Sequence, residues 1–66
     1  MENLIRSERE RRGWTQAVLA EHLEVSRQTV VALETGKYDP SLPLAFRISQ
    51  LFAKPLEDLF IPIRSR

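Results

Sequence analysis

The sequence contains no cysteine and only one histidine, His22. Without cysteine there is no disulfide, no thiolate zinc site and no cysteine nucleophile, and a single histidine excludes a histidine-based metal cluster. No apolar run approaches the roughly 18 residues that a membrane helix needs, and the start of the chain lacks the apolar stretch of a secretory signal. We therefore expect a cytoplasmic chain without metal, cofactor or membrane contact.

A large excess of one charge is also missing, since ten basic residues stand against nine acidic residues and give a net charge of +1. A strongly basic chain would indicate a polyanion partner such as nucleic acid. Composition supplies no such argument here, so any case for nucleic acid depends on a motif. With 66 residues, of which 42% are hydrophobic and 29% charged, the chain is expected to form one domain spanning residues 1–66.

Glycines, prolines and capping residues divide the sequence into short helical segments. Gly13 and Gly36 are candidate helix ends. The expected helices run from Asn3 to about Arg12, from the cap Thr15, from the cap Ser26 to about Thr35, from the cap Ser41, and from Pro55 to Leu59. Residues 60–63 should be extended, because Pro62 disfavours helix at the preceding residue. The predicted fold is all-α, a compact bundle of four to five short helices with or without a short C-terminal strand.

The segment from Thr15 to Gly36 is the most informative, because it holds two capped helices separated by only a few residues. Ala20, in the middle of the first of these helices, is small enough to let the second cross close to it. Val30 and Leu33 would hold the second helix against the core. Its outward residues would then be Arg27, Gln28, Val31 and Ala32. Reading the major groove of DNA requires such a rigidly held helix with a projecting N-terminus.

The pattern Gln16-x3-Ala20-x4-Val25-Ser26-x3-Val30-x2-Leu33-Glu34-x-Gly36 resembles the lambda-repressor-like, Cro-type (XRE) helix-turn-helix. Residues 26–42 and 55–60 are similar to the small one-domain regulators of that family in bacteria and archaea. The resemblance covers roughly residues 3–60. It implies sequence-specific binding to double-stranded DNA, usually by a dimer, and an ion pair between Arg9 and Glu34 that joins the first helix to the end of the recognition helix.

Arg27 and Gln28 are the expected base-reading residues, because arginine bonds bidentately to guanine and glutamine to adenine. The alternative for both is an ordinary solvated helix face. Val31 and Ala32 would touch a thymine methyl group or be plain surface. The other candidate DNA contacts are Gln16, Ser26, Thr29, Lys37 and Tyr38. Within this last group, Ser26 and Thr29 could also act only within their own helix, and Tyr38 could pack over Pro40.

Two positions depart from the family pattern. Glu24 occupies a turn position often held by glycine, and a left-handed conformation there costs a non-glycine residue about 1 kcal/mol. Either the turn differs or that cost is tolerated. Glu8 stands where the family usually has an apolar residue. Glu8 would pair with Arg12 or Arg11, or Trp14 would cover the gap beside it.

The sequence therefore predicts a dimeric repressor that blocks promoters, with double-stranded DNA as its partner and no evident small-molecule effector. The candidate dimer interface comprises the apolar residues Leu56, Leu59, Phe60, Ile61 and Ile63, although these residues could instead cover the core of their own chain. Alternatives are an antitoxin or restriction-system controller with the same motif, or a protein-interaction adaptor that kept the fold without binding DNA. No Ser-His-Asp spacing or phosphate-binding glycine loop supports an enzyme.

Overall fold

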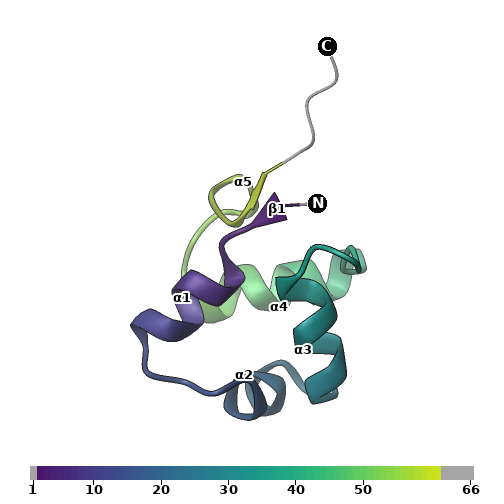
Figure 1. Cartoon of the computed structure of the whole chain (residues 1–66). Helices are drawn as coiled ribbons and strands as arrows, with labels where there is room; N and C mark the ends of the chain where they lie inside the picture. Colours follow the sequence, from purple (N-terminus) through teal and green to yellow (C-terminus); the bar gives the residue numbers. More distant parts are fainter. Residues whose placement is uncertain (1, 62–66) are drawn as a thin grey trace.

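The computed structural model describes residues 2–61 of the 66-residue chain. These residues form five helices and one antiparallel pair of short strands (Figure 1). The elements are β1 (Glu2–Asn3), α1 (Ile5–Arg11), α2 (Gln16–Leu23), α3 (Arg27–Glu34), α4 (Leu42–Phe52), α5 (Leu56–Leu59) and β2 (Phe60–Ile61). The all-α class is confirmed, and the C-terminal extended segment is present as β2.

The first helix begins at Ile5 rather than at Asn3, because Asn3 belongs to β1 and pairs with Phe60 in β2. The Asn3 side chain accepts a hydrogen bond from the backbone N–H of Ile5 at 3.1 Å. Its amide nitrogen donates to the carbonyl of Leu33 at 2.7 Å. One side chain therefore supports the start of α1 and ties β1 to the last turn of α3.

The described helices share one hydrophobic core. In Figure 1, α4 lies behind α1 and α3, α2 lies at the bottom, and α5 with the strand pair lies at the top. The core is formed by Ile5, Leu19, Ala20, Leu23, Val30, Leu33, Leu44, Ile48, Phe52, Leu59 and Phe60. Because residues from α1 through β2 contribute to it, the same core that stabilises the fold also holds α3 in place.

Hydroxyl side chains begin three of the helices, as the sequence predicted. Thr15 accepts from the backbone N–H of Val18 at 3.1 Å. Ser26 accepts from Thr29 at 3.1 Å, and Ser41 accepts from Leu44 at 3.4 Å. Each cap satisfies a backbone donor that the first turn of a helix leaves without a partner. Among residues 2–61, no helix has the length and apolar character needed to traverse a bilayer.

Two helices end on a non-glycine residue with left-handed backbone geometry. Glu24 follows α2 with a φ of 60°, and Ala53 follows α4 with a φ of 56°. Next to Glu24, the backbone N–H of Val25 donates to the carbonyl of Ala20 at 3.0 Å and closes the turn. The turn expected at Glu24 is therefore kept, and the chain tolerates the conformational cost of about 1 kcal/mol.

Candidate nucleic-acid interface

Helices α2 and α3 form a packed pair in which α3 has one buried face and one exposed face. Val30 and Leu33 are completely buried, and Ala20 of α2 is 5% exposed. At the first turn of α3, Arg27 and Gln28 are exposed. The partly exposed side chains of Val31 and Ala32 follow one turn later. The buried side chains of Val30 and Leu33 therefore hold α3 against the core, and the residues of the opposite face point toward solvent.

Among the lysine and arginine residues of the described chain, two differ from the others in having no carboxylate partner. Six basic side chains between residues 2 and 61 lie beside a carboxylate: Arg6, Arg9, Arg11, Arg12, Arg47 and Lys54. The remaining two in that range, Arg27 and Lys37, have no carboxylate partner within it. Both are exposed, one at the start of α3 and one shortly after its end. Within residues 2–61, the lysine and arginine side chains without a carboxylate partner therefore lie at the two ends of one helix, α3.

The hydroxyl groups of Ser26 and Thr29 bond to each other at the start of α3. Their oxygens are 2.9 Å apart, and Ser26 also accepts from the backbone N–H of Thr29. Ser26 is exposed and Thr29 is partly buried. The two residues therefore stabilise the first turn of α3. The outward amide of Gln28, like the guanidinium group of Arg27, has no partner within residues 2–61.

Gln16, at the start of α2, makes a contact that the sequence analysis did not anticipate. Its amide nitrogen donates to Oε1 of Glu34, at the end of α3, over 3.2 Å. An amide nitrogen carries two hydrogens, so one donor remains for a further acceptor. The side chain joins the beginning of α2 to the end of α3, and is partly buried between them.

Glu34 also receives a bidentate pair of hydrogen bonds from Arg9 of α1. Nε of Arg9 lies 2.6 Å from Oε2 of Glu34, and Nη2 lies 3.2 Å from Oε1. Nη1 of Arg9 donates to the carbonyl of Trp14 at 2.9 Å. The hydrogen bond with Glu34 raises the pKa of Arg9, although burial opposes the shift. The ion pair thus locks the last turn of α3 to α1 and to the α1–α2 connection.

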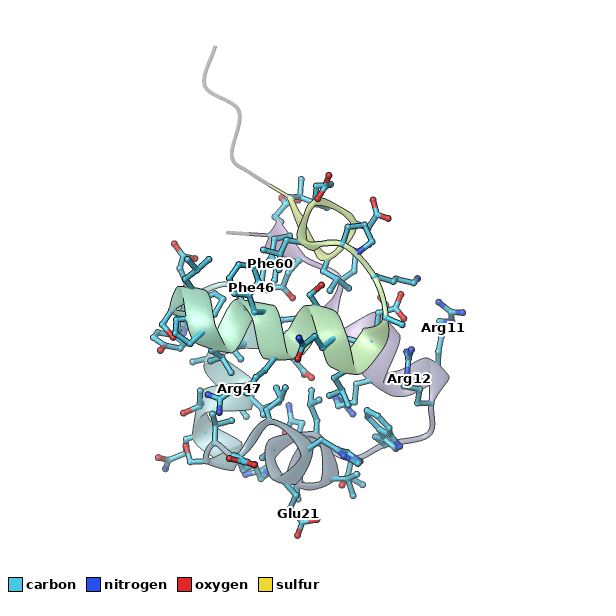
Figure 2. All side chains as sticks on the ribbon, turned by 180° about the vertical axis from the view of Figure 1, so that it is seen from behind. Arg11, Arg12, Glu21, Phe46, Arg47 and Phe60 are labelled. Carbon is cyan, nitrogen blue, oxygen red and sulfur yellow. The ribbon has the colours of Figure 1, made fainter. Side chains whose placement is uncertain are left out.

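Glu8 is a buried carboxylate surrounded by three cations. Nζ of Lys54 lies 2.6 Å from its Oε2, Nη1 of Arg12 lies 2.8 Å from its Oε1, and Arg11 lies 3.2 Å from its Oε2. Hydrogen bonds from Lys54 and Arg12 lower the pKa of Glu8 to about 2, against the opposing effect of burial. Figure 2 shows Arg11 and Arg12 at the same corner of the molecule. The sequence identified both arginines but missed Lys54, which lies 46 residues further along the chain.

Arg12 and Trp14 extend this corner into an aromatic cluster. The guanidinium group of Arg12 lies 4.8 Å from the ring centroid of Phe52 and 5.8 Å from that of Trp14. The rings of Trp14 and His22 stack with their centroids 4.4 Å apart. Trp14 packs against the edge of the core, with the guanidinium group of Arg12 over its ring. The family pattern would have an apolar residue at position 8. Here the ion pairs of Glu8 and the contacts of Arg12 with the two rings stabilise this part of the structure instead.

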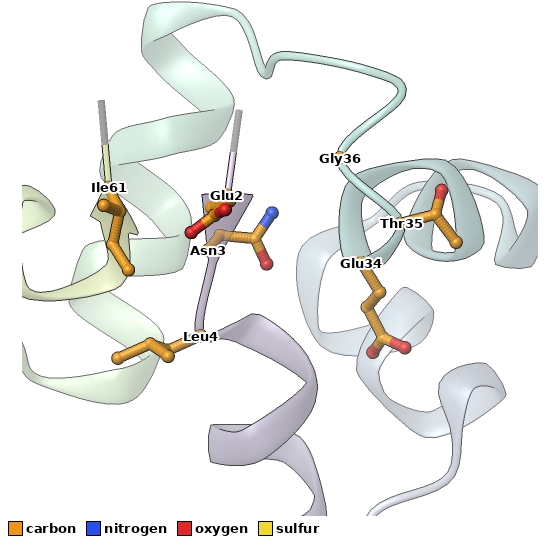
Figure 3. A pocket seen from close by; sticks show the side chains of 7 residues that line it. All are labelled: Glu2, Asn3, Leu4, Glu34, Thr35, Gly36 and Ile61. Carbon is orange, nitrogen blue, oxygen red and sulfur yellow. The ribbon is translucent and has the colours of Figure 1, made fainter. Parts of the chain in front are cut away.

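The residues proposed from the sequence for a dimer interface divide between core and surface. Leu59 is completely buried and Phe60 is 8% exposed, so both cover the core of their own chain. Leu56 is partly buried, Ile61 is 42% exposed, and Ile63 lies outside the described residues. Ile61 lines an open hollow of about 630 Å³ between the strand pair and the end of α3 (Figure 3).

Other exposed apolar side chains lie on α4. Leu42 is 62% exposed and Phe46 is 51% exposed, one helical turn apart. Figure 2 shows Phe46 on the side of α4 that faces the strand pair. Within residues 2–61 there is no group of three histidine, aspartate or glutamate side chains arranged to hold a metal ion.

A rigid α2–α3 pair with a left-handed turn residue and a projecting second helix defines the helix-turn-helix class of protein. The chain belongs to the helix-turn-helix family, whose model matches residues 5–59. It is 51% identical, over 92% of each chain, to an uncharacterized HTH-type transcriptional regulator from Methanocaldococcus jannaschii. It is 45% identical, over 91% of each chain, to the uncharacterized HTH-type transcriptional regulator YgzD from Bacillus subtilis. The XRE-type resemblance predicted from the motif is confirmed by the family match.

Proposed function

We propose that this protein is a transcriptional regulator that binds specific sequences in double-stranded DNA through α3. The observation that carries the proposal is the position of Arg27 and Lys37, the two described basic residues without a carboxylate partner. A cation at the surface that is not neutralised within the protein is available to a phosphate or to a base edge. The relatives' designation as HTH-type transcriptional regulators supports the same conclusion.

The exposed residues of α3 divide into two roles in this proposal. Arg27 and Gln28 enter the major groove, where arginine pairs with guanine and glutamine with adenine. Lys37 contacts the phosphate backbone after the end of α3 and fixes the register of the protein on the duplex. Gln16 and Ser26 lie at the starts of α2 and α3, where free backbone N–H groups add further phosphate contacts. Val31, Ala32, Thr29 and Tyr38 complete the contact surface.

The regulator acts as a homodimer that occludes promoters. One recognition helix reads only a few base pairs, whereas two related by a twofold axis reach half-sites about 34 Å apart and multiply the specificity. Within residues 2–61, the dimer contact is made by the exposed side chain of Ile61 and the partly buried side chain of Leu56. The buried side chains of Leu59 and Phe60 hold these two residues in place. This contact leaves the first turn of α3 free, because α5 and the start of α3 lie at different ends of the molecule (Figure 1).

Selection of bound duplexes from a random DNA pool tests this function. We expect an enriched site made of two inverted half-sites about one helical turn apart. Binding to that site should weaken steeply with salt, because displaced counterions accompany each phosphate contact. If no sequence is enriched and no duplex binds at low ionic strength, the protein is not a DNA-binding regulator and the interaction-adaptor alternative gains support.

A further inference from the structure

Asn3 joins the strand pair directly to the last turn of α3. Its amide nitrogen donates to the carbonyl of Leu33 at 2.7 Å, and its amide oxygen accepts from the backbone N–H of Ile5 at 3.1 Å. Figure 3 shows the side chain pointing from β1 toward the end of α3. Because both ends of the amide are engaged, the side chain has little freedom to turn away from α3.

The bond from Asn3 is made to the backbone of α3, which distinguishes it from the ion pair on the same turn. The Leu33 carbonyl accepts from Asn3 and from the backbone N–H of Gly36 at 3.1 Å, so both of its lone pairs are used. Arg9 reaches the same turn through the flexible side chain of Glu34. A bond to the carbonyl therefore fixes the backbone of α3 itself relative to β1.

At its other end, this connection reaches the surface proposed for the dimer contact. Glu2, the neighbour of Asn3 in β1, lies opposite Ile61 of β2, and Ile61 is the exposed residue of that contact. The backbone N–H of Leu4 donates to the carbonyl of Leu59 at 2.8 Å and joins β1 to α5. An open hollow of about 630 Å³ lies between the strand pair and the end of α3. Since packing is incomplete there, the Asn3 bond matters for how the two parts are held together.

We propose that Asn3 is a positioning residue that fixes α3 relative to the strand pair and so sets the orientation of the two recognition helices in the dimer. This inference rests on the proposed function, because it concerns how the same dimer places both α3 helices. A full site requires both helices to enter the major groove at once, whereas an isolated half-site requires only one. Loss of the Asn3 bond should therefore weaken binding to a full site and spare binding to a half-site.

Asn3→Ser tests this bond, because a serine hydroxyl also accepts from the N–H two residues further on but is too short to reach the Leu33 carbonyl. Fluorescence anisotropy at low salt measures binding of the full chain to the site selected from the random pool and to a duplex with one half-site. We expect the ratio of full-site to half-site affinity to fall about fivefold, the typical contribution of one intramolecular hydrogen bond, while half-site affinity stays within about twofold.

Two further variants separate positioning from stability. Asn3→Asp keeps the size and the acceptor of the side chain but removes its donor, so it should lower the ratio at least as much as Asn3→Ser. Ser49→Ala is the matched control, because it removes a bond of the same kind, from the Ser49 hydroxyl to the Lys54 carbonyl at 2.6 Å. This control should leave the ratio unchanged. Urea unfolding followed by circular dichroism establishes that each variant is folded under the binding conditions.

Three results would overturn the role of Asn3 and leave the DNA-binding function standing. The first is a ratio within twofold of the wild-type value in both Asn3 variants. The second is an equal loss on full sites and half-sites, and the third is an equal fall of the ratio in Ser49→Ala.

The proposed function fails in a different way. A wild-type chain that binds no duplex overturns both the function and the role of Asn3. A selected site that holds a single half-site removes the twofold arrangement and the role of Asn3 with it, but retains binding to DNA.

Discussion

Arg9 and Glu34 are joined by two parallel hydrogen bonds, although 25 residues separate them in the sequence. Their side chains are 11% and 4% exposed, so the pair is largely removed from solvent. Replacing one partner leaves the other charge buried without compensation, which costs about 3–5 kcal/mol, whereas replacing both by apolar residues of similar size costs far less. We therefore expect Glu34→Ala to destabilise the fold strongly and the combination of Arg9→Met with Glu34→Leu to be milder than the sum of its parts.

A double-mutant cycle in urea measures this coupling. The double variant still loses the bond from Arg9 to the Trp14 carbonyl and the bond from Gln16 to Glu34, so some destabilisation remains. Free energies of unfolding that add without a coupling term would show that the pair does not act as a unit.

Stability should fall at acidic pH because of Glu8. Its pKa is about 2 in the folded chain, against an ordinary value of 4.5. A lowered folded-state pKa gives stabilisation that is present above pH 4.5 and is lost as the pH falls toward 2. At about 1.4 kcal/mol per pKa unit, the loss across this range is about 2–3 kcal/mol. Glu8→Gln should lower stability at neutral pH and flatten the acid dependence of thermal unfolding; an unchanged acid profile would assign that dependence to other carboxyl groups.

Glu24→Gly should stabilise the protein. The backbone of Glu24 has a φ of 60°, a conformation that glycine adopts without the steric cost of a Cβ atom. The side chain contributes little in return, since it is 80% exposed and lies 3.9 Å from Arg47. We expect a gain of about 1 kcal/mol in the free energy of unfolding, less a contribution from the greater freedom of glycine in the unfolded chain. Glu24→Ala, which keeps the Cβ atom, is the matched control and should show no gain.

Arg27→Ala and Lys37→Ala should have different effects on DNA binding. Loss of a base contact from Arg27 should weaken the selected site by about 1–3 kcal/mol and relax the sequence preference at one position. Loss of a phosphate contact from Lys37 should weaken selected and random duplexes alike and lower the salt slope by about one. Equal losses on selected and random DNA for Arg27→Ala would remove its base-reading role.

The dimer contact is best tested at Ile61, because Phe60 is buried and its replacement would disturb the core. Ile61 is 42% exposed and pairs across the strands with Glu2, so Ile61→Lys adds a charge to the surface without a like charge opposite. Sedimentation equilibrium should show a shift from dimer to monomer. Ala17→Lys, at an exposed position of α2, should leave the mass unchanged. A dimer that survives Ile61→Lys would place the contact on another surface.

Features determined by neighbouring residues could be predicted from the sequence. The caps at Thr15, Ser26 and Ser41 depend on backbone groups three residues away, and the motif spacing defines the packing of α2 against α3. Strand β1 could not be foreseen, since its partner β2 lies at the other end of the described chain. The hydrogen bond between Lys54 and Glu8 could not be predicted either, because 46 positions separate the two residues in the sequence.

The contacts of surface residues could likewise be predicted only in part from the sequence. Sequence spacing indicated which residues of α3 point outward, but only the folded chain reveals which basic residues lack a carboxylate partner. Arg47 of α4, for example, lies 3.9 Å from a carboxylate oxygen of Glu24, a neighbour 23 positions earlier in the sequence. Leu59 and Phe60 looked unpartnered near the end of the sequence, but α5 and β2 fold back onto the core and bury both side chains.

The sequence contains one tryptophan, and it lies where three helices meet. The indole of Trp14 stacks on His22 of α2 and lies 6.3 Å from the ring of Phe52 of α4, close to the end of α1. Its emission is therefore a native optical signal for this junction, obtained without attaching a dye. Because the indole lies outside α3, the same signal can follow unfolding of each variant separately from its affinity for a duplex.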